Sequence, residues 1–169
     1  MTIGLLPITE LWFQVLVIML TFGMPVFLFL VPARITEKTK LVYVFLYIGV
    51  ILFITIIGRE SHPSQTSKLI PLSSYIRFQD VHIRWQIYMN IFLFIPLGYL
   101  IPFASKKTFL QTLVFGCCLS IGIELLQFIF ALGLCETDDV IHNTLGCIIG
   151  YWYWFGLSKL GEKLHRDRE

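Results

Sequence analysis

Charged residues are scarce in this chain. Only 14% of its 169 residues are Asp, Glu, Lys or Arg, whereas 56% are hydrophobic and 15% are aromatic. A soluble domain carries roughly 25% charged residues, so this composition excludes an ordinary soluble protein. The formal net charge of +2 is too small to suggest a nucleic-acid partner. We therefore expect an integral membrane protein whose single domain covers residues 1–169.

The usual signatures of catalysis and metal binding are also missing. The sequence holds no HExxH motif and no recognisable Ser/His/Asp set, and its four cysteines lack the spacing of a metal site. We expect no metal or other cofactor, and we interpret the cysteines as small apolar packing residues. The first eight residues are apolar without a positive region or a small-residue cleavage site, so we expect them to stay uncleaved.

Five segments are apolar and long enough to cross a bilayer, which takes about 20 residues. They are residues 11–31, 41–57, 86–103, 109–132 and 140–157. Pro25 and Pro96 lie inside two of these segments, and in a membrane the neighbouring helices can satisfy the backbone groups that a proline frees. The sequence therefore predicts an all-α integral membrane protein with five transmembrane helices.

Basic residues are unevenly divided between the two sides of such a bundle. One side holds Arg34, Lys38, Lys40, Lys106, Lys107, Lys159, Lys163, Arg166 and Arg168. The other side holds Arg59, Lys68, Arg77 and Arg84, all in a long loop at residues 58–85 between the second and third helices. The positive-inside rule then predicts an extracytoplasmic N-terminus and long loop, and a cytoplasmic C-terminus. The apolar residues of the loop indicate that it lies on the membrane surface or dips into it.

Polar side chains interrupt the fourth predicted helix. Ser120, Glu124 and Gln127 are spaced i, i+4, i+7, so they share one face. A carboxylate near the middle of a bilayer costs roughly 3 kcal/mol or more, and such residues face the bundle interior. We expect Glu124 to be protonated, paired with an arginine of the long loop, or in contact with water.

The fifth predicted helix has a similar face. Asp139, Asn143, Gly146 and Gly150 follow one another at i, i+4, i+7 and i+11. The small residues Gly146 and Gly150 allow another helix to approach closely. Asp139 stands at the helix N-terminus, where a carboxylate can also serve as a cap. We interpret its neighbour Asp138 as a solvated loop charge.

These faces could converge on one polar pocket that opens outward. Asn90, about one turn inside the third helix, would belong to the same pocket. The predicted ligand-binding residues are Asn90, Glu124, Gln127, Asp139 and Asn143, together with Arg59, Arg77 and Arg84, which could bind phosphate. The alternative for the amides is hydrogen bonding between helices, and for the arginines it is anchoring at the membrane surface. No catalytic residue can be named.

Four ordered segments resemble the VanZ-like family of bacterial membrane proteins. They are Leu69-Ile-Pro71, Asn90-Ile-Phe-Leu-Phe-Ile-Pro96-Leu-Gly98, Ser120-Ile-Gly-Ile-Glu124-Leu-Leu-Gln127 and Asp139-Val-Ile-His-Asn143-Thr144-Leu-Gly146. The resemblance covers about residues 58–155. It implies a multi-pass protein of the bacterial cell membrane and a link to resistance against teicoplanin, a lipidated glycopeptide that acts at the cell surface. Gly133 stands where many members carry an arginine, and an arginine of the long loop could substitute for it.

Several functions stay open at this point. The leading hypothesis is that the pocket binds the polar head of a membrane lipid or of a lipid-linked cell-wall precursor. A second is an enzyme acting on a lipid headgroup or polyprenyl phosphate, with Glu124 or Asp139 as general acid or base. A third is a small flippase or transporter with Glu124 as proton site, for which a homo-oligomer could supply the missing spans. A structural scaffold is the fourth.

Overall fold

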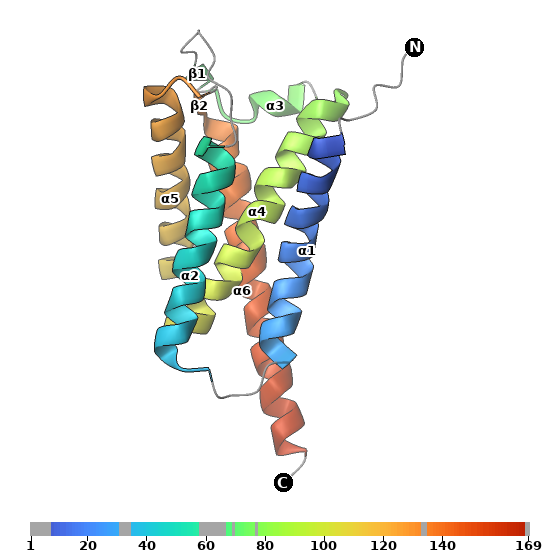
Figure 1. Cartoon of the computed structure of the whole chain (residues 1–169), viewed down its shortest axis with the longest axis vertical. Coiled ribbons are helices and arrows are strands. Elements are labelled where there is room, and N and C mark those ends of the chain that lie inside the picture. Colours follow the sequence, from blue (N-terminus) through green and yellow to red (C-terminus); the bar gives the residue numbers. More distant parts are fainter. Residues whose placement is uncertain are drawn as a thin grey trace.

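The computed structural model describes residues 8–30, 35–57, 67–68, 70–76, 78–132 and 135–167. Its long helices are α1 (Ile8–Leu30), α2 (Glu37–Leu52), α4 (Val81–Ser105), α5 (Phe109–Ile129) and α6 (Thr137–Arg166). Figure 1 shows that α1, α4 and α6 begin at the end of the bundle where α2 and α5 finish. Each predicted apolar segment lies mainly in one of these helices, although residues 53–57 and 130–132 lie beyond the ends of α2 and α5. The prediction of an all-α protein is confirmed. The prediction that the first eight residues stay uncleaved concerns a segment of which the structure describes only Ile8.

Four short elements gather at one end of the bundle, which we call the loop end. They are η1 (Phe53–Ile57), a π-helical continuation of α2, then β1 (Ser67–Lys68), α3 (Ser73–Ile76) and β2 (Cys135–Glu136) (Figure 1). The two strands pair in parallel, with Ser67 opposite Cys135. This pairing joins the long loop to the connection between α5 and α6.

The long loop is shorter than predicted because α4 begins at Val81 rather than near residue 86. Asp80 has extended backbone geometry, and its carboxylate accepts a hydrogen bond from the His82 amide at 2.9 Å. Such a cap satisfies one of the free amides in the first helical turn. The prediction of loop structure for residues 81–85 is therefore wrong.

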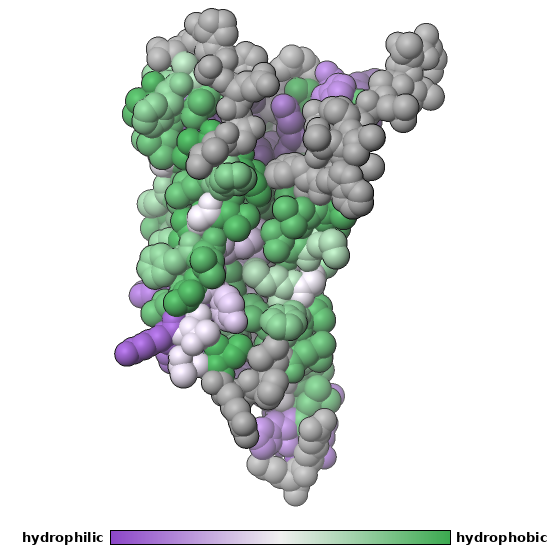
Figure 2. All heavy atoms as spheres, viewed as in Figure 1, coloured by the Kyte–Doolittle hydropathy of each residue, from purple (hydrophilic) through white to green (hydrophobic). Residues whose placement is uncertain are grey.

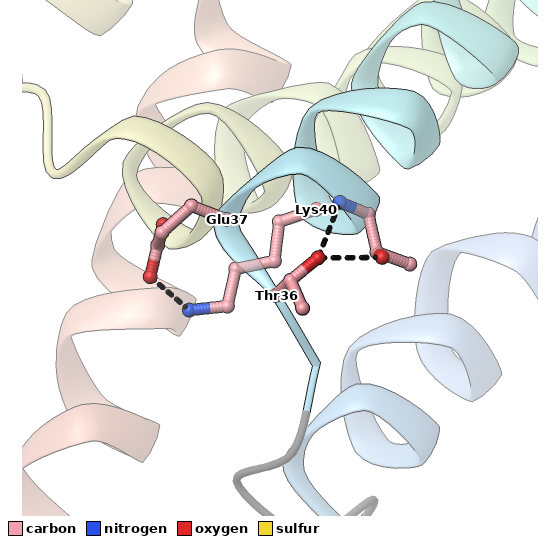
Figure 3. A network of polar contacts seen from close by, with 4 residues as sticks. Thr36, Glu37 and Lys40 are labelled. Atoms are coloured by element: carbon pink, nitrogen blue, oxygen red, sulfur yellow. Dashed lines mark hydrogen bonds and ion pairs between the residues drawn. The ribbon is translucent and has the colours of Figure 1, made fainter.

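Polar caps also fix the opposite end. At the start of α2, the Thr36 hydroxyl accepts a hydrogen bond from the Thr39 amide, and Lys40 pairs with Glu37 at 2.9 Å (Figure 3). At the start of α5, Thr108 and Gln111 form a reciprocal capping box. These contacts set where the chain turns back into the bundle.

The core lies around α4, whose middle is completely buried. Phe94, Leu97 and Leu100 have no exposed surface, and α4 contacts α1, α2, α5 and α6. Pro96 cannot donate to the carbonyl of Phe92, four residues earlier. The Thr21 hydroxyl of α1 lies 2.8 Å from that carbonyl oxygen. A hydroxyl of a neighbouring helix thus lies within reach of the backbone group that the proline frees, as predicted, and it shares its single hydrogen between this carbonyl and that of Val17, also at 2.8 Å.

Helices α4 and α6 approach each other closely along Gly98, Gly146 and Gly150, which we call the glycine seam. A Cβ atom added at Gly98 would lie 2.7 Å from the Cα of Cys147, and one at Gly150 would lie 2.9 Å from the Cα of Gly98. Both distances are shorter than real Cβ contacts, and they involve backbone atoms that cannot swing away. The predicted role of Gly146 and Gly150 in helix packing is confirmed.

Large apolar side chains cover the outside of the bundle. Figure 2 shows them as a broad band on one face, with hydrophilic residues toward the ends. Among the described residues, three helices are long and apolar enough to cross a membrane: Glu37–Ile56, Val81–Ser105 and Phe109–Ile129, while Val15–Leu30 is a shorter apolar helix. The coarser prediction, a membrane protein, agrees with this. The number of five spans is not confirmed, since α6 carries polar residues on its inner face and charges near both ends.

Candidate functional site

A line of polar side chains runs along the inner face of α5. Ser120, Glu124 and Gln127 are 0%, 4% and 1% exposed, although their neighbours Ile121, Leu125 and Phe128 lie on the outside. The prediction that the three share an inward face is confirmed. Together with Asn143 of α6, 4% exposed, these residues form what we call the polar seam.

Asn143 connects the two helices. Its Nδ2 atom donates to the Ser120 hydroxyl at 2.8 Å, whereas its Oδ1 atom has no hydrogen-bond partner. An amide offers two donor hydrogens and an acceptor with two lone pairs. Among the described residues, the contact with Ser120 therefore satisfies only part of the Asn143 side chain.

Gln127 connects α5 to η1. Its Nε2 atom donates to the backbone carbonyl of Thr55 at 2.9 Å. A carbonyl can only accept, so this bond fixes which end of the amide faces Thr55. The Oε1 atom is buried and has no hydrogen-bond partner within the part of the chain that the structure describes. The contact lies at a π-helical turn, a form of backbone that recurs at functional sites.

Glu124 lies between these two amides along the α5 face. Its Oε2 atom accepts a hydrogen bond from the backbone amide of Glu136 at 2.9 Å. Glu136 belongs to β2, which pairs with β1 of the long loop. A buried carboxylate on α5 thus holds the strand pair at the loop end. The thiol of Cys135 next to it has a raised pKa, because burial and then the charges of Glu124 and Asp139 all disfavour the thiolate.

Of the remaining predicted site residues, Asn90, Arg84 and Asp139 are described, and Arg59 and Arg77 are not. Asp139 is half-buried in the first turn of α6, and Asn90 is half-buried on α4. Within the described part of the chain, no hydrogen bond joins Asn90 to the polar seam. Arg84 donates from Nη1 to the carbonyls of Phe78 and Gln79, both at 3.0 Å, and so stabilises the loop backbone. The predicted ligands Arg59 and Arg77 are outside the described residues.

Asp138 is not the solvated loop charge that we expected. It is 1% exposed and accepts hydrogen bonds from the backbone amides of Leu72 and Ser74 and from the Ser73 hydroxyl. Burial alone would raise the pKa of this carboxyl, but the three donors outweigh it and lower the pKa. The expectation was wrong because donors more than 60 residues away replace water, and no local pattern reveals them.

His142 is buried beside Asp138. Its Nε2 atom lies 3.3 Å from the Tyr75 hydroxyl, and the two rings pack at 5.8 Å between centroids. Tyr75 and the Thr55 carbonyl are the contacts that sequence reasoning missed, since both come from distant segments. Among the described residues, no three His, Cys, Asp or Glu side chains are grouped to hold a metal ion. The arrangement is suited to hydrogen bonding with a polar ligand.

Comparisons with known proteins agree with the resemblance seen in the sequence. The VanZ/LLP1 family model matches residues 40–158, which is well over half of the chain. Protein VanZ of Enterococcus faecium is 41% identical over 70 residues, covering 41% of this chain and 43% of that protein. The chain therefore aligns with less than half of the length of this relative. No solved structure matches the chain significantly.

Proposed function

Since this chain belongs to the VanZ/LLP1 family, we propose that it is a bacterial membrane protein that contributes to teicoplanin resistance by binding a lipid or lipid-linked cell-envelope component. The family resemblance implies the link to teicoplanin, and the similarity to Protein VanZ supports it. The polar seam would hold the polar head of the bound molecule. Lipid-linked cell-wall precursors and membrane lipids both carry such heads.

One observation carries the proposal: two buried amide oxygens without partners flank a buried carboxylate. Among the described residues, the Oε1 atom of Gln127 and the Oδ1 atom of Asn143 accept no hydrogen bond. Glu124 lies on α5 between Gln127 and Ser120, the hydrogen-bond partner of Asn143. Leaving a buried acceptor unsatisfied costs about 1–3 kcal/mol. A headgroup that carries hydroxyl or ammonium donors would supply the missing hydrogen bonds. The described contacts thus favour donor-rich headgroups.

We further propose that all five long helices cross the membrane, with the loop end outside the cell. The opposite end carries Lys38, Lys40, Lys106, Lys107 and Lys159, and α6 reaches beyond the other helices there (Figure 1). Positive residues of this kind favour the cytoplasmic side. The polar seam then lies toward the surface at which teicoplanin acts, near the outward end of α5.

The test is teicoplanin susceptibility of a sensitive bacterial host that expresses the full chain. Gln127→Leu and Asn143→Leu remove the two unpaired oxygens, and Gln86→Leu is the matched control because Gln86 is exposed on α4. With equal membrane levels, we expect both seam variants to lose protection and the control to keep it. Full protection in the two seam variants would show that the polar seam is not needed for resistance.

A second measurement addresses binding directly. Native mass spectrometry of the purified protein, after incubation with a bacterial lipid extract, should show a bound lipid that is retained by Gln86→Leu and lost by Gln127→Leu. The same samples reveal chemistry, since a headgroup product that accumulates with time would favour the enzyme hypothesis over binding alone. An unliganded wild-type protein in every extract would contradict the binding proposal.

A further inference from the structure

The segment after β1 exposes an unusual amount of apolar surface. The exposed side chains are Ile70, Leu72, Tyr75, Ile76, Phe78 and Val81. Ile76 is 83% exposed and Ile70 is 73% exposed, so the bundle covers almost none of either side chain. Soluble proteins rarely expose contiguous apolar patches without a partner. These side chains therefore have a covering partner in the working protein.

The other face of the same segment is fixed to α6. Ser74 is buried, and its amide donates to Asp138 at 2.7 Å. Leu72 has a left-handed backbone (φ 63°), which is costly for a residue with a side chain, and its amide also donates to Asp138. The Tyr75–His142 contact adds a second attachment. The segment is therefore held with its apolar face outward.

Its backbone is suited to an apolar environment. Arg84 donates to the carbonyls of Phe78 and Gln79 at 3.0 Å each, so these polar groups need no water. Carbonyls that lie near lipid must be satisfied in this way. Directly after the segment, α4 begins as a helix long and apolar enough to cross a membrane. Trp85 and Tyr88 pack edge to face in its first turns, at the level where aromatic rings meet lipid headgroups.

We propose that residues 70–76 and Phe78 are seated in the membrane interface at the loop end, with the apolar face among lipids and the polar face attached to α6 through Asp138. Lipid is the occupant because the segment leads directly into α4, which is long and apolar enough to cross a membrane, and because the outward faces of α1, α2 and α5 carry large exposed apolar side chains as well. Figure 1 shows α3 lying across the end of the bundle, at the start of α4. The proposal does not depend on the ligand of the polar seam.

The experiment uses the full chain in nanodiscs of phosphatidylglycerol and phosphatidylcholine, with an environment-sensitive fluorophore on Ile76→Cys. Cys117, Cys118 and Cys135 are replaced by Ala to leave one reactive thiol, and Cys147 stays because it is buried. Lys163→Cys, an exposed position at the opposite end, is the aqueous control. We expect a lipid nitroxide near the headgroup to quench the Ile76 label at least threefold more than the Lys163 label. Aqueous iodide should show the reverse order.

Two outcomes would overturn the proposal. Equal iodide quenching at both positions would place residue 76 in water, and shielding from both quenchers would mean that protein, such as a second copy, covers the patch. Ile70→Cys repeats the test if the first variant does not fold. Asp138→Asn in the Ile76→Cys background should weaken lipid quenching, which distinguishes a segment fixed by Asp138 from one held by lipid alone.

Discussion

The contact of α6 with α4 and its contact with α5 are of different kinds. Toward α4, the glycine seam brings backbone against backbone, so that no room is left for a single added Cβ atom at Gly150. Toward α5, the helices are joined by a hydrogen bond between Asn143 and Ser120, and one end of the Asn143 amide has no partner. The contact between α4 and α6 is close-packed, whereas the contact between α5 and α6 leaves part of a buried amide without a hydrogen bond.

This difference separates stability from function. A close-packed contact gains dispersion energy all along its length and needs nothing further. A buried polar contact that is only partly satisfied contributes little, or costs stability, unless another molecule completes it. We infer that the glycine seam holds the bundle together, whereas the proposed function assigns the polar seam to ligand binding. Substitutions in the glycine seam should therefore lower the unfolding midpoint, whereas substitutions in the polar seam should lower resistance.

The largest effect is expected at Gly150. Its added methyl group in Gly150→Ala would meet the backbone of Gly98 and Tyr99, both at 2.9 Å, which forces α4 and α6 apart. Overpacking of this kind costs about 1–3 kcal/mol, and backbone partners place Gly150→Ala at the upper end. Thermal unfolding in detergent should show a clearly lower midpoint. Gly122→Ala, where nothing lies within 4 Å, is the control and should keep or slightly raise the midpoint.

The next effect concerns a third contact of α6, through Asp138. Its lowered pKa means that the folded protein binds the proton more weakly than the unfolded chain. The stabilisation is therefore complete above the ordinary pKa of 3.8 and is lost as the pH falls below it, through the folded pKa. Hydrogen exchange of residues 70–76 should stay slow from neutral pH down to about pH 4, after correction for intrinsic rates, and speed up below it.

Asp138→Asn tests the same contact at neutral pH. An amide oxygen accepts less well than a carboxylate, so we expect a local loss of about 1–2 kcal/mol and exchange that no longer changes at acid pH. Asp80→Asn is the control, because Asn caps a helix as well as Asp does. Exchange in residues 70–76 that is equally slow in Asp138→Asn would show that lipid or packing, and not this carboxylate, holds the segment.

Short-range patterns were enough to predict the helices and two inward faces. Apolar runs located every long helix, and the spacing of Ser120, Glu124 and Gln127 identified one buried face, because helical periodicity is local. The spacing of Gly146 and Gly150 likewise predicted close packing against another helix, although it could not identify which helix. These features need no knowledge of distant residues.

The errors arise where distant segments meet. The pairing of β1 with β2 involves two residues on each strand, too few to leave a pattern in the sequence. Burial of Asp138 depends on donors in α3 and just before it. The start of α4 was different, since Asp80 is a recognisable cap and could have located Val81 as the first helical residue.

A small effect on stability is expected in the polar seam. Asn143→Leu and Gln127→Leu each remove an unsatisfied oxygen but also take away the hydrogen bond to the Ser120 hydroxyl or the Thr55 carbonyl, so that a gain and a loss of similar size offset each other. Hydrogen bonds between membrane helices contribute about 0.6 kcal/mol on average, so the unfolding midpoint should change by much less than in Gly150→Ala. Loss of resistance at an unchanged unfolding midpoint would support the assignment of stability to the glycine seam and of function to the polar seam. A decrease in the midpoint as large as in Gly150→Ala would contradict it.

The smallest effect reports the charge state of Glu124. Burial and then the charges of Glu124 and Asp139 raise the pKa of the Cys135 thiol, and only the thiolate reacts quickly with a maleimide. Glu124→Gln removes one of these negative charges, so it should lower the pKa of Cys135 and raise its alkylation rate at neutral pH, by less than tenfold because burial remains. The matched control is Glu162→Gln, since Glu162 is exposed near the C-terminal end of α6. The alkylation rate of Cys135 is measured from samples quenched at successive times, in a Cys117→Ala, Cys118→Ala background. An unchanged rate would mean that Glu124 is already protonated in the wild-type protein.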